Sequence, residues 1–215
     1  MPEKRKMEYK TYLFDFDYTL ADSSRGIVIC FRNVLTRHGH TDITDESIKR
    51  TIGKTLEDSF SILTGITDKN TLISYKKEYV KEADIHMTAN TKFFPETVAV
   101  LKALKKRGAQ IGIISTKYRY RIHEMVDQHF PTKFFDIIIG GEDVKKAKPS
   151  PQGLLKALRC LHRKKKDTLY IGDSIIDAQT ALLAGVDFVG VLNGMTTREE
   201  LAEYRHRQIL PDLTL

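Results

Sequence analysis

The sequence contains little cysteine: only Cys30 and Cys160 occur among its 215 residues. Two thiols cannot supply the dense disulfide framework that stabilises small secreted domains. Both cysteines lie in apolar segments with helical spacing, so we expect buried free thiols in a reducing compartment.

Long hydrophobic runs are also missing, since none approaches the roughly 18–20 residues that a membrane span needs. The basic first ten residues are followed by a segment that Asp15 and Asp17 interrupt, so we expect no secretory signal and predict a cytoplasmic protein. A chain of 215 residues with 41% hydrophobic and 29% charged residues is typical of an ordinary globular protein. This length suits one large domain, or a core domain with a smaller insertion.

The net charge of +7 raises the question of nucleic-acid binding. Residues 22–88 contain ten basic and ten acidic side chains, so the whole excess lies elsewhere, mainly in 102–107, 145–148 and 163–166. We interpret the clusters at 102–107 and 163–166 as solvated charges near helix ends, where cations interact favourably with the helix dipole. No nucleic-acid motif accompanies them. A non-catalytic binding protein with a basic core surface remains the alternative from another functional class.

Five short segments, rich in β-branched or aromatic residues, predict strands. They cover 11–15, 110–115, 134–140, 168–173 and 187–192. Helical patterns at 95–108, 119–130, 150–162 and 174–184 lie between or before the later strands. Nearly continuous apolar strands that alternate with helices are typical of a parallel sheet covered on both faces. We therefore predict a doubly wound, Rossmann-like α/β core.

The interval between the first two strands is much longer than a crossover requires. Apolar residues at 27, 30, 31, 34 and 35 form one helical stripe, and further helices are predicted at 45–50, 55–63 and 68–87. We predict an inserted all-helical cap domain at residues 23–89. Residues 1–22 and 90–215 then form the catalytic core.

Polar, chemistry-bearing residues follow the predicted strands, at the edge where ligands bind in open parallel sheets. Asp15 and Asp17 follow the first strand, and Ser115 and Thr116 end the second. Three further residues come from two later segments: Lys148, Asp173 and Asp177. Carboxylates from separate loops form an oxygen-ligand site that suits Mg²⁺. Such a cation offsets the repulsion between buried acids, while a lysine and a hydroxyl can bind phosphoryl oxygens.

Four segments resemble, in order, the motifs of the haloacid dehalogenase-like hydrolases. The stretch DFDYTLADS (15–23) is similar to their first motif, DxDGTLxDS, and IIST-K (113–117) to their second. AKPSP (147–151) and IGDSIIDAQTALLAG (171–185) are similar to the third and fourth. The long insertion after the first motif, and GVLNGMTTREEL (190–201), resemble the phosphoglycolate phosphatase-like branch.

The resemblance implies a role for each matching residue. Asp15 would be the nucleophile and a Mg²⁺ ligand, and Asp17 the acid and base, with its backbone carbonyl on the metal. Asp173 would also bind Mg²⁺, and Asp177 would orient the metal's surroundings. The phosphoryl-binding residues would be Ser115, Thr116 and Lys148. The cap residues Arg25, Gly53 and Lys54 are candidate substrate contacts.

The implied function is Mg²⁺-dependent hydrolysis of a small phosphomonoester, such as phosphoglycolate, through an aspartyl-phosphate. Asp17 argues against dehalogenation, because the dehalogenases of this superfamily lack its counterpart. A nucleotide or pyrophosphate phosphatase and a sugar phosphomutase remain alternatives, although mutases usually carry Val where Thr19 stands. Tyr18 departs from the family pattern, which has Gly there. The expected partner is a small phosphorylated metabolite, with neither nucleic acid nor membrane.

Overall fold

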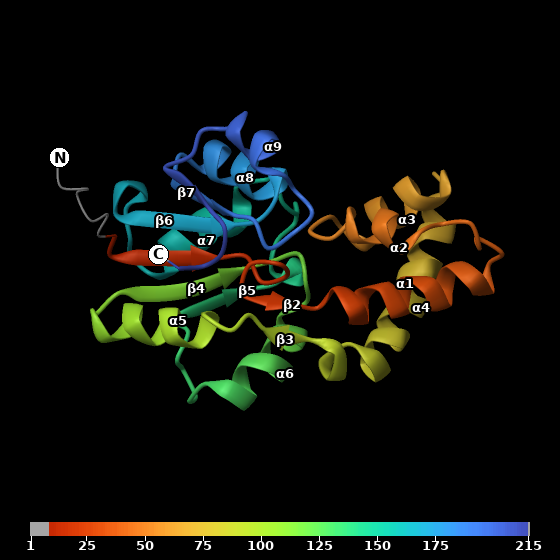
Figure 1. The fold of residues 1–215 in the computed structure, drawn as a ribbon, viewed down its shortest axis with the longest axis horizontal. Helices are drawn as coiled ribbons and strands as arrows, with labels where there is room; N and C mark the ends of the chain where they lie inside the picture. The colour runs from red at the N-terminus through yellow and green to blue at the C-terminus, as the bar shows by residue number, and fades with distance from the viewer. Residues whose placement is uncertain (1–8, 215) are drawn as a thin grey trace.

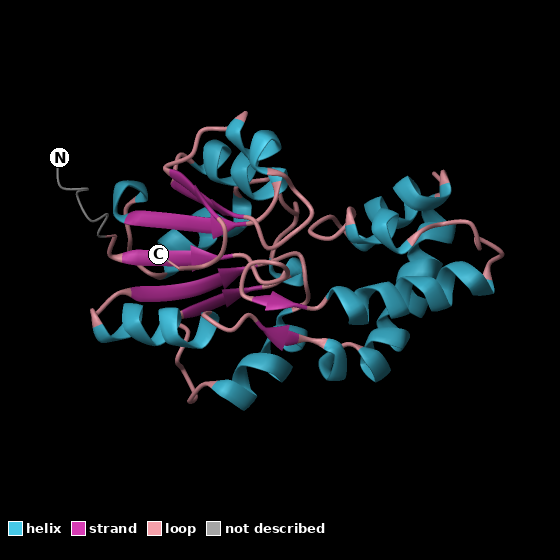
Figure 2. Ribbon diagram, viewed as in Figure 1, coloured by secondary structure: helices cyan, strands magenta, loops and turns pink. Residues whose placement is uncertain are grey.

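A parallel sheet forms the centre of the α/β core in the computed structural model, which describes residues 9–214 (Figures 1 and 2). Its six strands in this part of the chain are β1 (Thr11–Phe14), β4 (Gln110–Ile114), β5 (Ile137–Ile139), β6 (Thr168–Gly172), β7 (Asp187–Val191) and β8 (Gln208–Leu210). Their order is β5-β4-β1-β6-β7-β8, and every neighbouring pair is parallel. The predicted doubly wound α/β fold is confirmed. Residues 1–8 of the predicted core lie outside the described residues.

Helices cover both faces of the sheet. One face carries α5 (Thr97–Lys106) and α6 (Arg119–His129). The other face carries α7 (Gln152–Cys160), α8 (Ile175–Ala184) and α9 (Arg198–Ala202), with the short turns η2 (Gly141–Asp143) and η3 (Lys165–Asp167) in nearby loops. The crossovers on two faces bring the carboxyl ends of the strands to one edge of the sheet.

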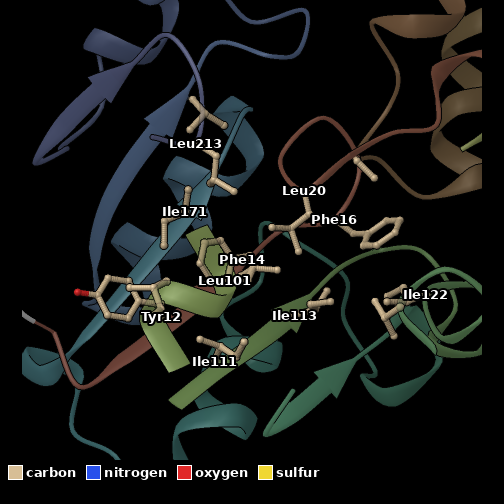
Figure 3. Packing of buried hydrophobic residues seen from close by; sticks show 14 of the residues in the cluster. Tyr12, Phe14, Phe16, Leu20, Leu101, Ile111, Ile113, Ile122, Ile171 and Leu213 are labelled. Atoms are coloured by element: carbon tan, nitrogen blue, oxygen red, sulfur yellow. The ribbon is translucent and has the colours of Figure 1, made fainter. Parts of the chain in front are cut away.

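Strand β1 shows how the sequence produces this layering. Successive side chains of a strand point to opposite faces, so Tyr12 and Phe14 pack beneath α5 while Leu13 packs on the side of α7 and α8. Figure 3 shows Phe14 beside Leu101 and Ile171 in the first of these layers. All four residues of β1 are buried, which explains why its sequence has no polar face.

The helical insertion lies to one side of the sheet (Figure 1). It contains α1 (Ser24–Arg37), α2 (Asp45–Lys49), α3 (Leu56–Thr64), α4 (Lys69–His86) and η1 (Thr88–Asn90), and we call it the helical cap. The two chain segments that enter and leave it pair as the antiparallel strands β2 (Ala21–Asp22) and β3 (Lys92–Phe93). The division into separate domains at residues 23 and 89 stays a prediction.

The helical cap has a hydrophobic core of its own. Phe31, Phe60 and Tyr79 are buried, and the Phe31 ring lies 4.7 Å from that of Phe60 and 4.8 Å from that of Tyr79, between centroids. Helix α3 begins at a Thr55 cap that accepts from Asp58 N–H, and it ends at Gly65 in the left-handed conformation. The apolar stripe of α1 and these capping residues therefore specify the helices and their packing.

The two cysteines differ in exposure. Cys30 is buried in the helical cap, whereas Cys160 is exposed, so the prediction of a buried thiol at Cys160 was wrong. Cys160 is the last residue of α7, whose buried face is formed by Gly153, Leu154, Ala157 and Leu158. Cys160 lies outside this buried face, so its side chain is exposed to solvent. Both thiols are free, as predicted.

Within residues 9–214, no helix combines the length and the apolar character that crossing a membrane requires.

The predicted placement of one basic cluster is confirmed, because Lys105 and Lys106 occupy the last turn of α5.

We expect Phe60→Ala to destabilise the helical cap by about 3–5 kcal/mol, since the change leaves a cavity among packed rings. Urea denaturation followed by circular dichroism measures this loss. Ile62→Ala is the matched control, because Ile62 lies on the same helix with 59% of its surface exposed. The control should change stability by less than about 0.5 kcal/mol. Equal effects of the two substitutions would contradict the assigned core.

Candidate active site

A buried ion-pair cluster occupies the carboxyl edge of the sheet. Asp15 follows β1, Asp173 follows β6, and Lys148 reaches them from the loop before α7. The Lys148 Nζ lies 2.9 Å from Asp15 Oδ1 and 2.7 Å from Asp177 Oδ1. Each of these side chains is at most 9% exposed. The structure thus brings together residues that are far apart in the sequence.

Asp177 connects the cluster to the surrounding fold. Its Oδ1 accepts from Lys148 Nζ at 2.7 Å and from the Tyr170 hydroxyl at 2.8 Å. Its Oδ2 accepts from the Ser174 hydroxyl at 2.6 Å and the Ser174 N–H at 3.2 Å, which forms the capping box of α8. Both oxygens are therefore engaged, and Asp177 fixes the direction in which Lys148 points.

Three carboxylates in the cluster lie close enough to share a cation. One oxygen from each of Asp15, Asp173 and Asp177 falls within 4.8 Å of the other two. Burial raises the pKa of Asp15 to about 7, with Lys148 opposing the shift and Asp177 and Asp17 adding to it. Burial, and then the charges of Asp177 and Asp15, raise the pKa of Asp173 well above its ordinary value.

The raised pKa values of Asp15 and Asp173 indicate that the Lys148 ammonium alone does not balance the negative charge of the buried carboxylates. Burial opposes the charged form of Lys148, but the carboxylates of Asp15 and Asp177 raise its pKa above the usual value, so it remains cationic. A divalent cation bound by oxygen ligands would compensate the remaining charge. The donor set and its burial therefore fit Mg²⁺.

Asp173 is held from two sides. The Thr19 hydroxyl donates to its Oδ1 at 3.2 Å, and the loop after β7 presses against its other oxygen. A Cβ at Gly194 would lie 2.0 Å from Asp173 Oδ2, so only glycine fits while the carboxylate keeps this position.

Asp17 is not one of the three grouped carboxylates, and its own carboxylate contacts residues near the helical cap. Its Oδ1 accepts a hydrogen bond from the Ser23 hydroxyl and lies 3.1 Å from Lys117 Nζ. The same ammonium lies 3.6 Å from the Met87 sulfur. Ser23 directly precedes α1, where the chain enters the helical cap, and Met87 lies between α4 and η1, near the point where the chain leaves it. Asp17 is thus positioned at the junction of cap and core.

The two predicted hydroxyl residues after β4 have different surroundings. Ser115 is buried, and its Oγ accepts from the Lys117 N–H at 3.2 Å. The Thr116 hydroxyl instead donates to the Gly53 carbonyl of the helical cap at 3.3 Å. Ser115 lies on the strand-end rim as predicted, whereas Thr116 connects the core to the cap.

A cavity of about 450 Å³ lies between the helical cap and the core. Asp17, Thr116 and Lys117 line it from the core, and Gly53 and Lys54 line it from the cap. Arg25 is exposed on the first turn of α1 and is absent from the described residues that line the cavity. The structure therefore places two of the three predicted cap contacts at this cavity.

Tyr18 adopts a left-handed backbone conformation, with a φ of 58°. This conformation is most easily adopted by glycine, which explains the glycine in the family pattern. The side chain is only 7% exposed, and its Cβ lies 3.2 Å from the position that a Cβ of Gly194 would occupy. Tyr18 thus packs against the loop beside Asp173, and it is outside the described cavity lining.

Sequence reasoning missed several residues of the site. Tyr170 lies within an apolar strand, so the sequence predicts only a core residue there, although its hydroxyl donates to Asp177. Gly194 carries no side chain that could suggest a role. The ion pair between Lys117 and Asp17 follows from the approach of two loops. Only the position of Lys117, two residues after a predicted phosphate ligand, offered a signal.

Comparisons with known proteins agree with this geometry. The family model described as haloacid dehalogenase-like hydrolase matches residues 12–191. The chain therefore belongs to the haloacid dehalogenase-like hydrolase family. A crystal structure of a haloacid dehalogenase-like hydrolase from Bacteroides fragilis is 61% identical, with a TM-score of 0.95 over 96% of this chain and 98% of that one.

Two curated relatives have more specific names. The pyrophosphatase PpaX of Anoxybacillus flavithermus is 30% identical over 92% of this chain and 90% of its own. A phosphoglycolate phosphatase of Aquifex aeolicus is 28% identical over 82% of this chain and 81% of its own. Both relatives act on small phosphorylated compounds according to their names.

We expect Mg²⁺ affinity to rise with pH, because Mg²⁺ competes with the proton that Asp15 holds below its pKa of about 7. For that single group, the affinity at pH 6 should be about tenfold weaker than at pH 8.

In the metal-free protein, the raised pKa of Asp15 contributes stability that is fully present below about pH 4 and is lost as the pH rises through about 7. Titration calorimetry and thermal melts at both pH values measure these effects. A pH-independent affinity would contradict the assignment of Asp15 as a ligand.

We expect Gly194→Ala to weaken Mg²⁺ binding at least tenfold, because the added methyl group displaces the Asp173 carboxylate. Gly194 is outside the positive-φ glycines of the described chain, so alanine adds no backbone strain there. Titration calorimetry measures the affinity. Thr196→Ala, two residues further along the same loop, is the control and should bind Mg²⁺ like the unmodified protein. An unchanged affinity in Gly194→Ala would show that Asp173 does not require this close approach.

Proposed function

We propose that the protein is a Mg²⁺-dependent phosphatase that hydrolyses a small phosphomonoester through an aspartyl-phosphate intermediate. One observation carries the proposal: a buried Asp15 lies at a strand end, 2.9 Å from Lys148 and grouped with Asp173. A purely structural ion pair would not require a second and third buried acid beside it. Membership of a hydrolase family and the names of the relatives support this reading.

Asp15 and Asp173 would hold Mg²⁺, together with the backbone carbonyl of Asp17. When bound, the cation would neutralise phosphoryl charge and keep both carboxylates ionised. Asp177 would orient these groups through Lys148 without binding the metal, because both of its oxygens already accept hydrogen bonds.

Asp15 would attack phosphorus, so that a bond forms from its carboxylate oxygen as the ester oxygen leaves. Asp17 would give its proton to the departing alcohol and then take a proton from the water that cleaves the aspartyl-phosphate. This second step restores the Asp15 carboxylate and the protonated form of Asp17, and it releases inorganic phosphate. Ser115 and Lys148 would hold the phosphoryl oxygens during both steps.

The helical cap, which already contacts the core through Gly53 and Thr116, would cover these residues and exclude bulk water. Gly53 and Lys54 already line the cavity opposite Asp17. The closed site would stabilise the charge on the transferring group, since the interior strengthens electrostatic interactions.

Phosphoglycolate and pyrophosphate are the first two substrates to test. Cations outnumber acids on the described cavity wall, because Lys76 pairs with Glu57, Lys117 with Asp17, and Arg121 with Asp84 and Glu124 outside the lining, which leaves the charges of Lys54 and Lys145. This balance favours an anionic substrate. Pyrophosphate is the second candidate because the 30% identical relative is named a pyrophosphatase. The cytoplasmic location stays a prediction.

We expect Asp15→Asn to lower Mg²⁺-dependent release of phosphate at least a thousandfold, because the amide cannot form the phosphoryl intermediate. The assay is a colorimetric phosphate measurement with p-nitrophenyl phosphate. Asp127→Asn, an exposed acid on α6, is the control and should retain full activity. Circular dichroism should show that Asp15→Asn remains folded. Full activity in Asp15→Asn would overturn the assignment of the nucleophile.

A further inference from the structure

The cavity between cap and core has an apolar wall that the proposed chemistry does not use. Five hydrophobic or aromatic side chains along it are only half-buried, and they are Ile52, Leu56, Val80, Tyr118 and Val144. The first three come from the helical cap, and the last two from loops of the core. Apolar surface left in contact with water at a binding cavity favours a ligand that covers it.

The cavity is present although the helical cap is already seated on the core. The Thr116 hydroxyl donates to the Gly53 carbonyl at 3.3 Å, and a Cβ at Gly53 would lie 3.9 Å from Ser174 Oγ. At another point of the junction, Arg50 Nη1 lies 4.0 Å from Glu200 Oε1. Figure 1 shows the loop before α3 extending from the cap toward the core. The volume therefore belongs to an arrangement in which cap and core touch.

This volume is large for the two substrates considered above. A cavity of about 450 Å³ falls within the range of about 300–1,000 Å³ that is typical of drug-sized ligands. Glycolate or a second phosphate would leave most of it filled with water. Both are also small and mostly polar, with at most one methylene group, so neither would cover the half-buried side chains of Ile52, Leu56 and Val80.

One wall of the cavity presents an aromatic ring. Tyr118 lies directly after Lys117, the residue that holds Asp17, and its ring is half-buried. The Tyr120 ring stacks beside it, with centroids 5.9 Å apart and planes 27° apart. Lys76 Nζ lies 5.9 Å from the centroid of Tyr118. A planar ring entering from the side of Asp17 would meet an aromatic surface on the core and aliphatic side chains on the cap.

We propose that the substrate is a phosphomonoester whose alcohol carries an aromatic ring, held between Tyr118 on the core and Ile52, Leu56 and Val80 on the cap. The proposal rests on the phosphatase function proposed above and narrows it to a substrate class. The phosphoryl group would lie at Asp15 and Lys148, which are outside the described lining of the cavity, and the ring would extend past Asp17 into the cavity. The ring's burial would select these esters over small polar ones.

The experiment compares kcat/KM for matched phosphate esters with the Mg²⁺-loaded protein. Adenosine 5′-monophosphate and ribose 5-phosphate share the same phosphorylated sugar and differ in the ring. Pyridoxal 5′-phosphate tests a ring that has no sugar. We expect at least one ring ester to exceed ribose 5-phosphate and phosphoglycolate by tenfold or more. A preference for one ring ester over the other identifies the source of the ring.

Tyr118→Ala and Leu56→Ala test the two walls. Each should lower the ratio of kcat/KM between the preferred ring ester and ribose 5-phosphate at least fivefold. Ile62→Ala, on the exposed face of α3, is the matched control and should leave the ratio unchanged. An unchanged ratio in both Tyr118→Ala and Leu56→Ala would overturn the proposed binding position of the ring.

The outcomes separate this proposal from the phosphatase function. Hydrolysis of ribose 5-phosphate or phosphoglycolate at least as efficiently as every ring ester would overturn the ring proposal and leave the phosphatase function intact. Absence of Mg²⁺-dependent hydrolysis for all of these compounds would overturn both.

Discussion

The buried ammonium of Lys148 is the interaction on which the site depends. It lies 2.9 Å from Asp15 and 2.7 Å from Asp177, and all three groups are removed from water. A carboxylate buried without a partner is very costly, so β1, α8 and the loop before α7 must meet for the charges to be compensated. This requirement links three distant chain segments. It also explains why the hydrogen bonds of Asp177 with Tyr170 and Ser174 leave no oxygen unused.

Close backbone approach is the second constraint. A Cβ at Gly172 would lie 2.5 Å from the Asp177 side chain, and one at Gly194 would lie 2.0 Å from Asp173 Oδ2. The acids can therefore gather only because the neighbouring backbone carries no side chains. Packing of this density fixes the carboxylates before any ligand arrives. A preorganised set of charges avoids reorganisation during phosphoryl transfer, which is why the geometry suits this chemistry.

The sequence predicted the features that local patterns determine. Buried strands such as β1 are continuous apolar runs, and the polar residues that end them must share one edge of a parallel sheet, so Asp15 and Asp173 could be placed together. Strand β8 was missed because Gln208–Leu210 is short, partly exposed and preceded by polar residues. The roles of Lys117 and Gly194 depend on contacts between loops. Nothing in their own segments encodes those contacts.

The same distinction separates the chemistry from the specificity. The acids and Lys148 lie at or near strand and helix ends, whose positions follow from the fold, whereas the cavity wall combines α3 and α4 with the loop at Tyr118. The helical pattern of the sequence predicts that Leu56 lies on one face of α3 and Val80 on one face of α4. It cannot show whether either face meets the interior of the cap or the cavity. The site that binds the leaving group forms only where cap and core meet, so its shape cannot be predicted from the sequence pattern of either part alone.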